Sequence, residues 1–169
     1  MEPQSVHEVF RGKIIRLDVE SWPSGEYETV HHLGAAAVLP ITPAGDVLLV
    51  RQFRPAIRQS LTEIPAGLLD RADEDPLTCA ARELFEETGY RHTSIEFLGG
   101  YYASAGFTDE YVHLFLARTE PEPSAGPEEG IELVREPFHR MVRAAQAGRV
   151  RDVKTALALL LAAGRIPGV

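Results

Sequence analysis

The pattern of hydrophobic and polar positions predicts a series of short strands. Runs rich in aliphatic and β-branched residues, some alternating with polar ones, are typical of strands. They cover residues 7–20, 27–42, 47–51, 61–64, 95–102, 111–118 and 131–135. Glycine and proline predict turns near Gly12, over 21–28 and over 43–46, and the segments 67–75 and 103–110 are expected to be loops.

Three later segments carry apolar residues at helical spacing. The first has well-marked ends, because Asp75 suits an N-cap, Pro76 suits the first helical position, and Gly89 suits the left-handed residue after the last turn. Amphipathic patterns predict two more helices over 137–148 and 152–163. Strands interleaved with a few helices, without an internal repeat, predict a mixed α/β or α+β fold.

Composition and charge exclude some classes of function. The chain has 169 residues, which suits one domain with a sizeable core. Its 17 basic and 25 acidic residues leave a net charge of -8, which argues against a general nucleic-acid-binding protein. A small phosphate-bearing ligand is still compatible with this charge, because a metal ion inverts the local field.

The sequence also suggests where the protein works. No apolar run approaches the roughly 20 residues of a membrane span. The first residues, MEPQSVHEVF, lack the basic-then-apolar layout of a signal peptide. Cys79 is the single cysteine, so no internal disulfide forms, and we expect it to be a buried apolar residue rather than a nucleophile. These features favour a cytoplasmic protein without a membrane partner.

The predicted helix before Gly89 carries a group of carboxylates. Glu83, Glu86 and Glu87 are three or four residues apart, so they share one face of the helix and repel one another. A hard divalent cation with oxygen ligands resolves this repulsion, and Mg²⁺ usually brings phosphate with it. The alternative is a solvated helix face with salt bridges, which a bare E-x-x-E-E pattern favours. Gly67, Arg82 and Gly89 complete a longer pattern around these glutamates. Their presence favours a metal site over a solvated helix face.

Residues 67–90 resemble the signature of the Nudix hydrolase family, G-x5-E-x7-R-E-U-x-E-E-x-G-U, where U is a bulky apolar residue. Glu74 is followed by seven residues, then by Arg82-Glu83-Leu84, Glu86-Glu87 and Gly89-Tyr90. The chain departs from the signature twice. Six residues separate Gly67 from Glu74 instead of five, and Tyr90 stands where an aliphatic residue is commoner.

The resemblance implies a fold and a metal site. The expected fold over residues 34–169 is the Nudix α/β/α sandwich, with a mixed sheet and a catalytic box that forms a loop, a helix and a loop. Glu83, Glu86, Glu87 and the carbonyl of Ala66 are the implied ligands of Mg²⁺ or Mn²⁺. Arg82 is implied to hold the clustered carboxylates in place, and Glu74 to pair with this arginine or support the loop.

Segments outside the signature are similar to the ADP-ribose pyrophosphatase subfamily. They are VRQFRPA at 50–56, EIPAG at 63–67, SAGFTDE at 104–110 and GRVRDVKTALALLL at 148–161. The implied reaction is metal-dependent hydrolysis of ADP-ribose to AMP and ribose 5-phosphate. Two alternatives stay open: the substrate is another nucleoside-diphosphate compound, such as a nucleotide sugar, or the protein is a ligand-sensing module without catalysis. The intact signature argues against the sensing module.

The same resemblance implies further site residues. In the acidic segment 120–133, Glu129 is our choice for the general base or a further metal ligand, with Glu128 and Glu132 as alternatives. The loop 120–130 is expected to be mobile and to serve as a lid.

Candidate substrate-binding residues follow from the similar segments. Arg51 and Arg54 are both candidates, but residues three apart on a strand face opposite sides, and we choose Arg54 for a phosphate or ribose contact. Gly106 is expected to let the ligand approach the backbone. Glu110 is implied to hold a ribose or a metal-bound water.

The N-terminal strands over residues 1–33 have too little helical cover to be stable alone. We therefore hypothesise that they pair with a second copy and form a homodimer, as the resembling subfamily does. None of the six histidines has zinc-like spacing to a second type of ligand, and the adjacent His31 and His32 are interpreted as surface or interface residues. Trp22 and Tyr27 are interpreted either as a stacking platform for adenine or as packing residues.

Overall fold

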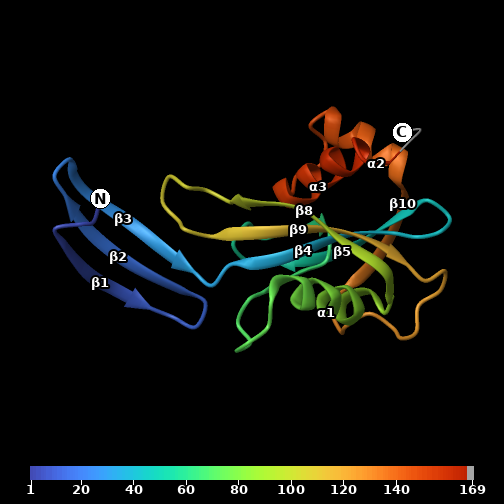
Figure 1. Ribbon diagram of the computed structural model, residues 1–169, viewed down its shortest axis with the longest axis horizontal. Helices are drawn as coiled ribbons and strands as arrows, with labels where there is room; N and C mark the ends of the chain where they lie inside the picture. The colour runs from blue at the N-terminus through green and yellow to red at the C-terminus, as the bar shows by residue number, and fades with distance from the viewer. Residues whose placement is uncertain (167–169) are drawn as a thin grey trace.

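The computed structural model describes residues 1–166, which form two β-sheets and three α-helices (Figure 1). The first sheet consists of β1 (Ser5–Arg11), β2 (Ile15–Trp22) and β3 (Gly25–His32). The second sheet consists of β4 (Ala35–Ile41), β5 (Asp46–Arg54), β6 (Gln59–Glu63), β7 (Ala66–Leu68), β8 (His92–Tyr102), β9 (Tyr111–Thr119) and β10 (Glu132–Pro137). The helices are α1 (Pro76–Thr88), α2 (Phe138–Gln146) and α3 (Val153–Ala163).

The larger sheet is mixed. Its strand order is β10-β5-β4-β9-β8, with β6 beside β5 and β7 beside β4. The central strands β4 and β9 run parallel, in a register from Ala35 opposite Val112 to Ile41 opposite Arg118, whereas the other pairs are antiparallel. This pairing brings segments that are far apart in the sequence to the same end of the sheet.

Helices cover both faces of the larger sheet, because its central strands are apolar on both sides. α2 and α3 pack on one face, in a cluster that includes Leu39, Leu49, Leu114, Val142 and Leu159. α1 packs on the other face, in a cluster that includes Val38, Leu48, Leu84, Tyr90 and Phe115. The α/β/α sandwich with a mixed sheet is thereby confirmed (Figure 1).

The ends of α1 form as the sequence predicts. The Asp75 side chain accepts hydrogen bonds from the amides of Leu77 and Thr78, at 2.9 and 3.0 Å. Gly89 has φ of +75°, and a Cβ there would lie 1.9 Å from the carbonyl oxygen of Ala125. Glycine is therefore required at this position both by its left-handed conformation and by the close approach of the chain.

The prediction of a turn over residues 21–28 was wrong. β2 and β3 continue through this segment and pair Ser21 with Glu26 and Trp22 with Gly25, which leaves only a tight turn at Pro23 and Ser24. The polar composition suggested a longer turn, but cross-strand pairing overrides local composition in an antiparallel hairpin. A short strand, β7, also replaces the start of the loop expected over 67–75.

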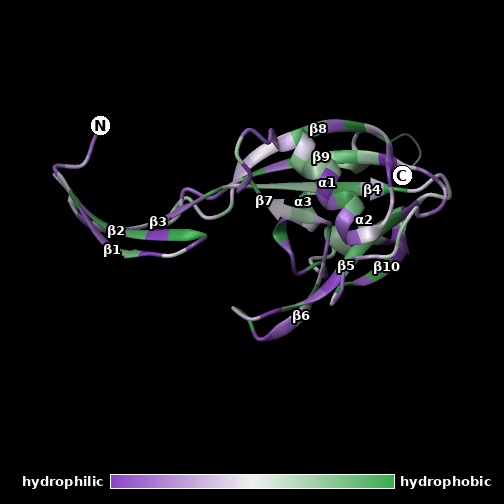
Figure 2. Cartoon of the chain, turned by 90° about the horizontal axis from the view of Figure 1, so that it is seen from below, coloured by the Kyte–Doolittle hydropathy of each residue, from purple (hydrophilic) through white to green (hydrophobic). Residues whose placement is uncertain are grey.

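The N-terminal sheet extends away from the rest of the molecule (Figures 1 and 2). β3 meets the loop between β8 and β9, where the Val30 amide donates to the Phe107 carbonyl at 2.7 Å and the Asp109 amide donates to the Val30 carbonyl at 3.2 Å. Large apolar side chains on this sheet and its first turn are exposed: Val6, Val9, Phe10, Ile14 and Ile15. Among residues 1–166, no helix has the length and apolar character needed to cross a membrane.

Candidate active site

Arg82 lies at the centre of the acidic face of α1. Its Nε and Nη2 atoms donate to the two carboxylate oxygens of Glu74 at 2.7 and 2.8 Å. Its Nη1 atom donates to Glu83 and, at 2.8 Å, to Glu86. The planar guanidinium thus holds three carboxylates at once, as the sequence resemblance implies, and only a side chain with this fork geometry does so.

Glu83 occupies space that only a glycine leaves open. A Cβ on Gly67 would lie 1.8 Å from the Glu83 Oε1 atom. Because Gly67 has no side chain, β7 lies close to the carboxylate of Glu83. This close approach gives the first glycine of the signature a physical role. The extra residue between Gly67 and Glu74 is accommodated in the loop before α1, where Asp73 has φ of +66°.

Glu87 is the most buried carboxylate of the group, with 6% of the residue exposed. Its Oε2 atom accepts a hydrogen bond from the amide of Ala66 at 3.1 Å, which places Ala66 beside the acidic face as expected. Burial raises the pKa of Glu87 to about 7, and the Ala66 amide only partly opposes this effect. Burial also raises the pKa of Glu83, against the hydrogen bond from Arg82.

The charges of this group fit a divalent cation. Glu74, Glu83, Glu86 and Glu87 carry four negative charges when ionised, while Arg82 and Arg71, whose Nη2 atom lies 3.4 Å from Glu86, carry two positive charges. The difference is two negative charges, and the donor atoms are carboxylate oxygens of the kind that hard divalent ions prefer. The assignment of Glu83, Glu86, Glu87 and the Ala66 carbonyl as the residues that would hold the metal stays a prediction.

The raised pKa of Glu87 predicts that the free energy of unfolding of the metal-free protein depends on pH. Because the pKa in the folded state, about 7, lies above the ordinary 4.5, the stabilising contribution is complete below pH 4.5 and is lost as the pH rises through 7. The loss amounts to at most about 3 kcal/mol. We expect Glu87→Gln, measured by denaturant unfolding in EDTA, to be more stable than the wild type at about pH 8 and to lose this advantage at about pH 4.

The control for this experiment is Glu96→Gln, which changes an exposed glutamate on β8. Its stability relative to the wild type should not vary with pH. If the difference between Glu87→Gln and the wild type were the same at all pH values, the pKa of Glu87 would be the same in the folded and unfolded states and the prediction would fail.

A cavity of about 590 Å³ is lined in part by Ala66 and Gly67 on β7, which contact Glu87 and closely approach Glu83. Its lining includes Arg54, Glu63, Ala66, Gly67, Glu110 and Lys154. Arg54 thus reaches this cavity, whereas Arg51 is exposed and is not among its lining residues. The contact of Arg54 with the substrate stays a prediction. Glu110 lines both this cavity and a neighbouring one of about 250 Å³.

Gly106 is not part of the cavity that Arg54 and Glu110 line. It lines a cavity of about 350 Å³ between the N-terminal sheet and the loop 103–110, together with Trp22 and Tyr27. A Cβ on Gly106 would meet nothing within 4 Å, so no neighbouring group in residues 1–166 requires a glycine there. Its expected contact with a ligand stays a prediction.

The acidic loop 120–130 is fastened to the C-terminal end of α1. The amide of Ser124 donates to the Gly89 carbonyl at 2.8 Å, and the amide of Glu128 donates to the Glu86 carbonyl at 3.0 Å. The charge of Glu128 contributes to the raised pKa of Glu87. Glu128 is therefore held near the carboxylate group, and the choice of Glu129 as the general base stays a prediction.

Sequence reasoning missed Glu63 and Lys154. Glu63 is 1% exposed and accepts hydrogen bonds from Arg54 and Lys154. Glu63 belongs to the EIPAG segment, and Lys154 follows two residues after the N-cap Asp152, but neither position has a local periodicity that marks a role. Their meeting depends on the packing of α3 against the sheet.

Cys79 behaves as expected from the sequence. It is fully buried, and burial raises the pKa of its thiol to about 12. A thiol with such a pKa is not ionised at neutral pH, so it is not a nucleophile.

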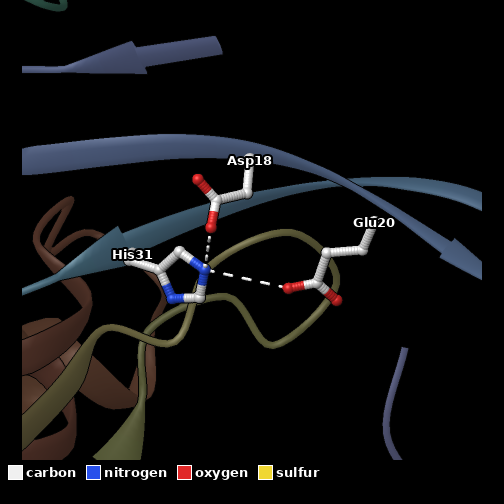
Figure 3. A group of neighbouring side chains, drawn as sticks. All are labelled: Asp18, Glu20 and His31. Atoms are coloured by element: carbon white, nitrogen blue, oxygen red, sulfur yellow. Dashed lines mark ion pairs between the residues drawn. The ribbon is translucent and has the colours of Figure 1, made fainter. Parts of the chain in front are cut away.

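A second group of titratable side chains lies on the N-terminal sheet, away from α1. Figure 3 shows His31 on β3 directed at Asp18 and Glu20 on β2, with Nε2 to carboxylate oxygen distances of 3.2 and 3.8 Å. Arg16 already neutralises Asp18 at 3.0 Å, and Asp109 binds the other imidazole nitrogen at 2.6 Å. The group therefore links the sheet to the loop 103–110, which gives His31 an interface role within one chain.

Comparisons with known proteins identify relatives and a solved structure with a similar fold. An ADP-ribose pyrophosphatase of Bacillus subtilis (strain 168) is 37% identical over 161 residues, which are 90% of this chain and 86% of that protein. A GDP-mannose pyrophosphatase of Cronobacter sakazakii (strain ATCC BAA-894) is 34% identical over 159 residues, 88% of this chain and 78% of that protein. A crystal structure of an ADP compounds hydrolase superposes with a TM-score of 0.79 and covers 99% of this chain and 96% of that one; at 21% identity it shows the shared fold.

The NUDIX domain family matches residues 30–157, which include the whole larger sheet and the helices α1 and α2. The match spans the glycine, the arginine and the glutamates whose arrangement is described above. The chain belongs to the NUDIX hydrolase family.

Proposed function

We propose that the protein hydrolyses the pyrophosphate bond of ADP-ribose, with Mg²⁺ or Mn²⁺, to AMP and ribose 5-phosphate. The observation that supports this most directly is the group of glutamates held by Arg82 beside the 590 Å³ cavity. The cavity also carries Arg54, a cation suited to a phosphate group. The similarity to an ADP-ribose pyrophosphatase over most of the chain favours this substrate. A cytoplasmic location is part of the same proposal.

The residues of the chain have distinct tasks in this reaction. Bound divalent ions would neutralise the phosphate oxygens and lower the pKa of a water molecule. Arg82 keeps Glu83 and Glu86 in place before the metal arrives, and the Ala66 amide does the same for Glu87. Arg54 orients the diphosphate, and Glu129, on the loop fastened to α1, takes the proton from the attacking water.

A nucleotide sugar is the second candidate substrate. The similarity to a GDP-mannose pyrophosphatase covers nearly as much of the chain as that to the ADP-ribose pyrophosphatase. Both reactions use the same metal-bound diphosphate, so the choice depends on the residues around the two ends of the cavity. A ligand-sensing module without catalysis is disfavoured, because every charged residue of the signature is present.

The experiment that tests the function is a substrate panel. ADP-ribose, GDP-mannose and other nucleoside-diphosphate compounds are incubated with the protein and either Mg²⁺ or Mn²⁺, and the products are separated by chromatography. We expect AMP and ribose 5-phosphate as the main products, with the highest kcat/KM for ADP-ribose. In ¹⁸O-labelled water, the labelled product identifies the phosphorus atom that the water attacks. A higher kcat/KM for GDP-mannose would replace ADP-ribose by a nucleotide sugar.

We further propose that the N-terminal sheet forms a homodimer. Val6, Val9 and Phe10 on β1 are each more than half exposed, and the sheet extends away from the main body, as Figure 2 shows. A second copy would cover these apolar side chains. We expect sedimentation at micromolar concentration to give a dimer and Phe10→Glu to give a monomer, whereas a wild-type monomer would contradict this proposal.

A further inference from the structure

The lining of the 590 Å³ cavity contains a buried carboxylate between two cations. Arg54 donates to Glu63 through Nε at 2.6 Å and through Nη2 at 3.0 Å. Lys154 donates to the same carboxylate at 2.5 Å. Burial alone would raise the pKa of Glu63, but the hydrogen bonds from Arg54 and Lys154 outweigh it, so the pKa lies below its ordinary value. Glu63 is therefore ionised at neutral pH.

The carboxylate fixes both cations at the cavity rather than in solvent. Side chains of arginine and lysine are long and lose much rotamer freedom when they are held in one geometry. Here the side chains of Arg54 and Lys154 are 39% and 20% exposed, and both line the 590 Å³ cavity. The ion pairs with Glu63 therefore hold both cations at one wall of the cavity.

The helix α3 does not need Lys154 for its own structure. Its N-cap is Asp152, whose Oδ2 atom accepts hydrogen bonds from the amide and the hydroxyl of Thr155 at 2.9 and 2.5 Å. The Thr155 hydroxyl in turn accepts a hydrogen bond from the amide of Ile64 at 2.8 Å, which attaches α3 to the segment after Glu63. Asp152 and Thr155 thus make the cap and the attachment without the lysine side chain.

Both cations keep donor groups for a ligand. Within residues 1–166, Lys154 donates to Glu63 and Asp152, which uses two of the three hydrogens of an ammonium group. Arg54 donates only to Glu63 there, so its Nη1 atom is not used. Arg54 lines the cavity from β5 and Lys154 lines it from α3.

We propose that Lys154 is a substrate-binding residue that donates to the diphosphate from α3, and that Glu63 is the positioning residue that holds Lys154 and Arg54 at the cavity. The proposal rests on the diphosphate hydrolysis proposed above. It makes the last helix a part of the substrate site and assigns a role to a lysine far from the signature in the sequence. The ligand class is a diphosphate with oxygens on both sides of the bridging atom.

The test compares lysine variants in binding and in catalysis. ADP-ribose is titrated by calorimetry in EDTA, where no metal supports turnover, and KM and kcat are measured separately with Mg²⁺. Loss of one charge-assisted hydrogen bond should raise both Kd and KM about tenfold in Lys154→Met, with kcat changed less than about threefold. Lys154→Arg should restore most of the affinity. A purely structural role would instead lower the thermal stability of Lys154→Met and leave the Kd of the folded protein unchanged.

The sequence contains two lysines, so Lys13→Met on the N-terminal segment is the matched control and should bind as the wild type does. Glu63→Gln should raise Kd at least as much as Lys154→Met, because it releases both cations, and the double variant should be little worse than Glu63→Gln alone. If Lys154→Met or Glu63→Gln did not fold, the Kd values of Lys154→Gln and Lys154→Arg would be compared instead. A higher Kd in Lys154→Gln would support the role of Lys154, and equal values would overturn it.

The outcomes separate this inference from the proposed function. A wild-type protein that binds ADP-ribose but does not hydrolyse it would overturn the function alone. An unchanged Kd in a folded Lys154→Met variant would overturn the role of Lys154 alone. Absence of ADP-ribose binding by the wild type would overturn both.

Discussion

In the Glu86→Gln variant, we expect kcat for ADP-ribose to fall about a thousandfold, because a neutral amide replaces a charged carboxylate that we propose as a metal ligand, and several kcal/mol of transition-state stabilisation are lost. The fold should persist. The Glu86 side chain is 39% exposed, and Arg82 keeps its hydrogen bonds to Glu74 and Glu83. Steady-state kinetics over a range of Mg²⁺ concentrations, with thermal unfolding of the same preparation, measure both effects.

The matched control for Glu86→Gln is again Glu96→Gln, the same chemical change at an exposed site on β8. It should leave kcat and the metal dependence unchanged. Turnover of Glu86→Gln at the wild-type rate at saturating Mg²⁺ would show that the acidic face of α1 does not carry the reaction, and the assignment of the metal ligands would be abandoned.

The second large effect is expected for Gly67→Ala. The added Cβ would lie 1.8 Å from Oε1 and 2.6 Å from Cγ of Glu83, so either β7 or the glutamate must move. A displacement of about 1 Å in a catalytic site reduces the rate about a hundredfold, and we expect this loss in kcat. Metal affinity should fall as well, because Glu83 is one of the proposed ligands. Calorimetric titration with Mn²⁺ and steady-state kinetics measure the two effects.

Gly164→Ala is the control for this substitution. A Cβ on Gly164 would meet only the Leu161 carbonyl oxygen at 3.6 Å, an ordinary contact, so activity should stay at the wild-type level. Wild-type kinetics in Gly67→Ala would mean that the Glu83 side chain lies elsewhere during catalysis.

The parts of the molecule that could be predicted from the sequence depend on local spacing. The cap at Asp75, the end at Gly89 and the shared face of Glu83 and Glu86 follow from the geometry of one helix. The α/β/α arrangement follows from a resemblance that is itself concentrated in this helix and its flanking loops. These features can therefore be predicted without knowledge of distant contacts.

The parts that could not be predicted depend on packing between distant segments. Lys154 reaches Glu63 only because α3 packs on the sheet, and 91 residues separate the two positions. The segment 120–130 was expected to be mobile because of its composition, yet backbone hydrogen bonds fasten it to the end of α1 at Ser124 and Glu128. Neither contact has a short-range pattern that a single sequence displays.

The three carboxylates that Arg82 holds have a consequence for the resting enzyme between turnovers. In the proposed reaction, the guanidinium would stay bound to Glu74, Glu83 and Glu86 after the products leave, and its positive charge would offset the repulsion among the carboxylates of α1. The site would then be ready for the next ion without any rearrangement of the helix.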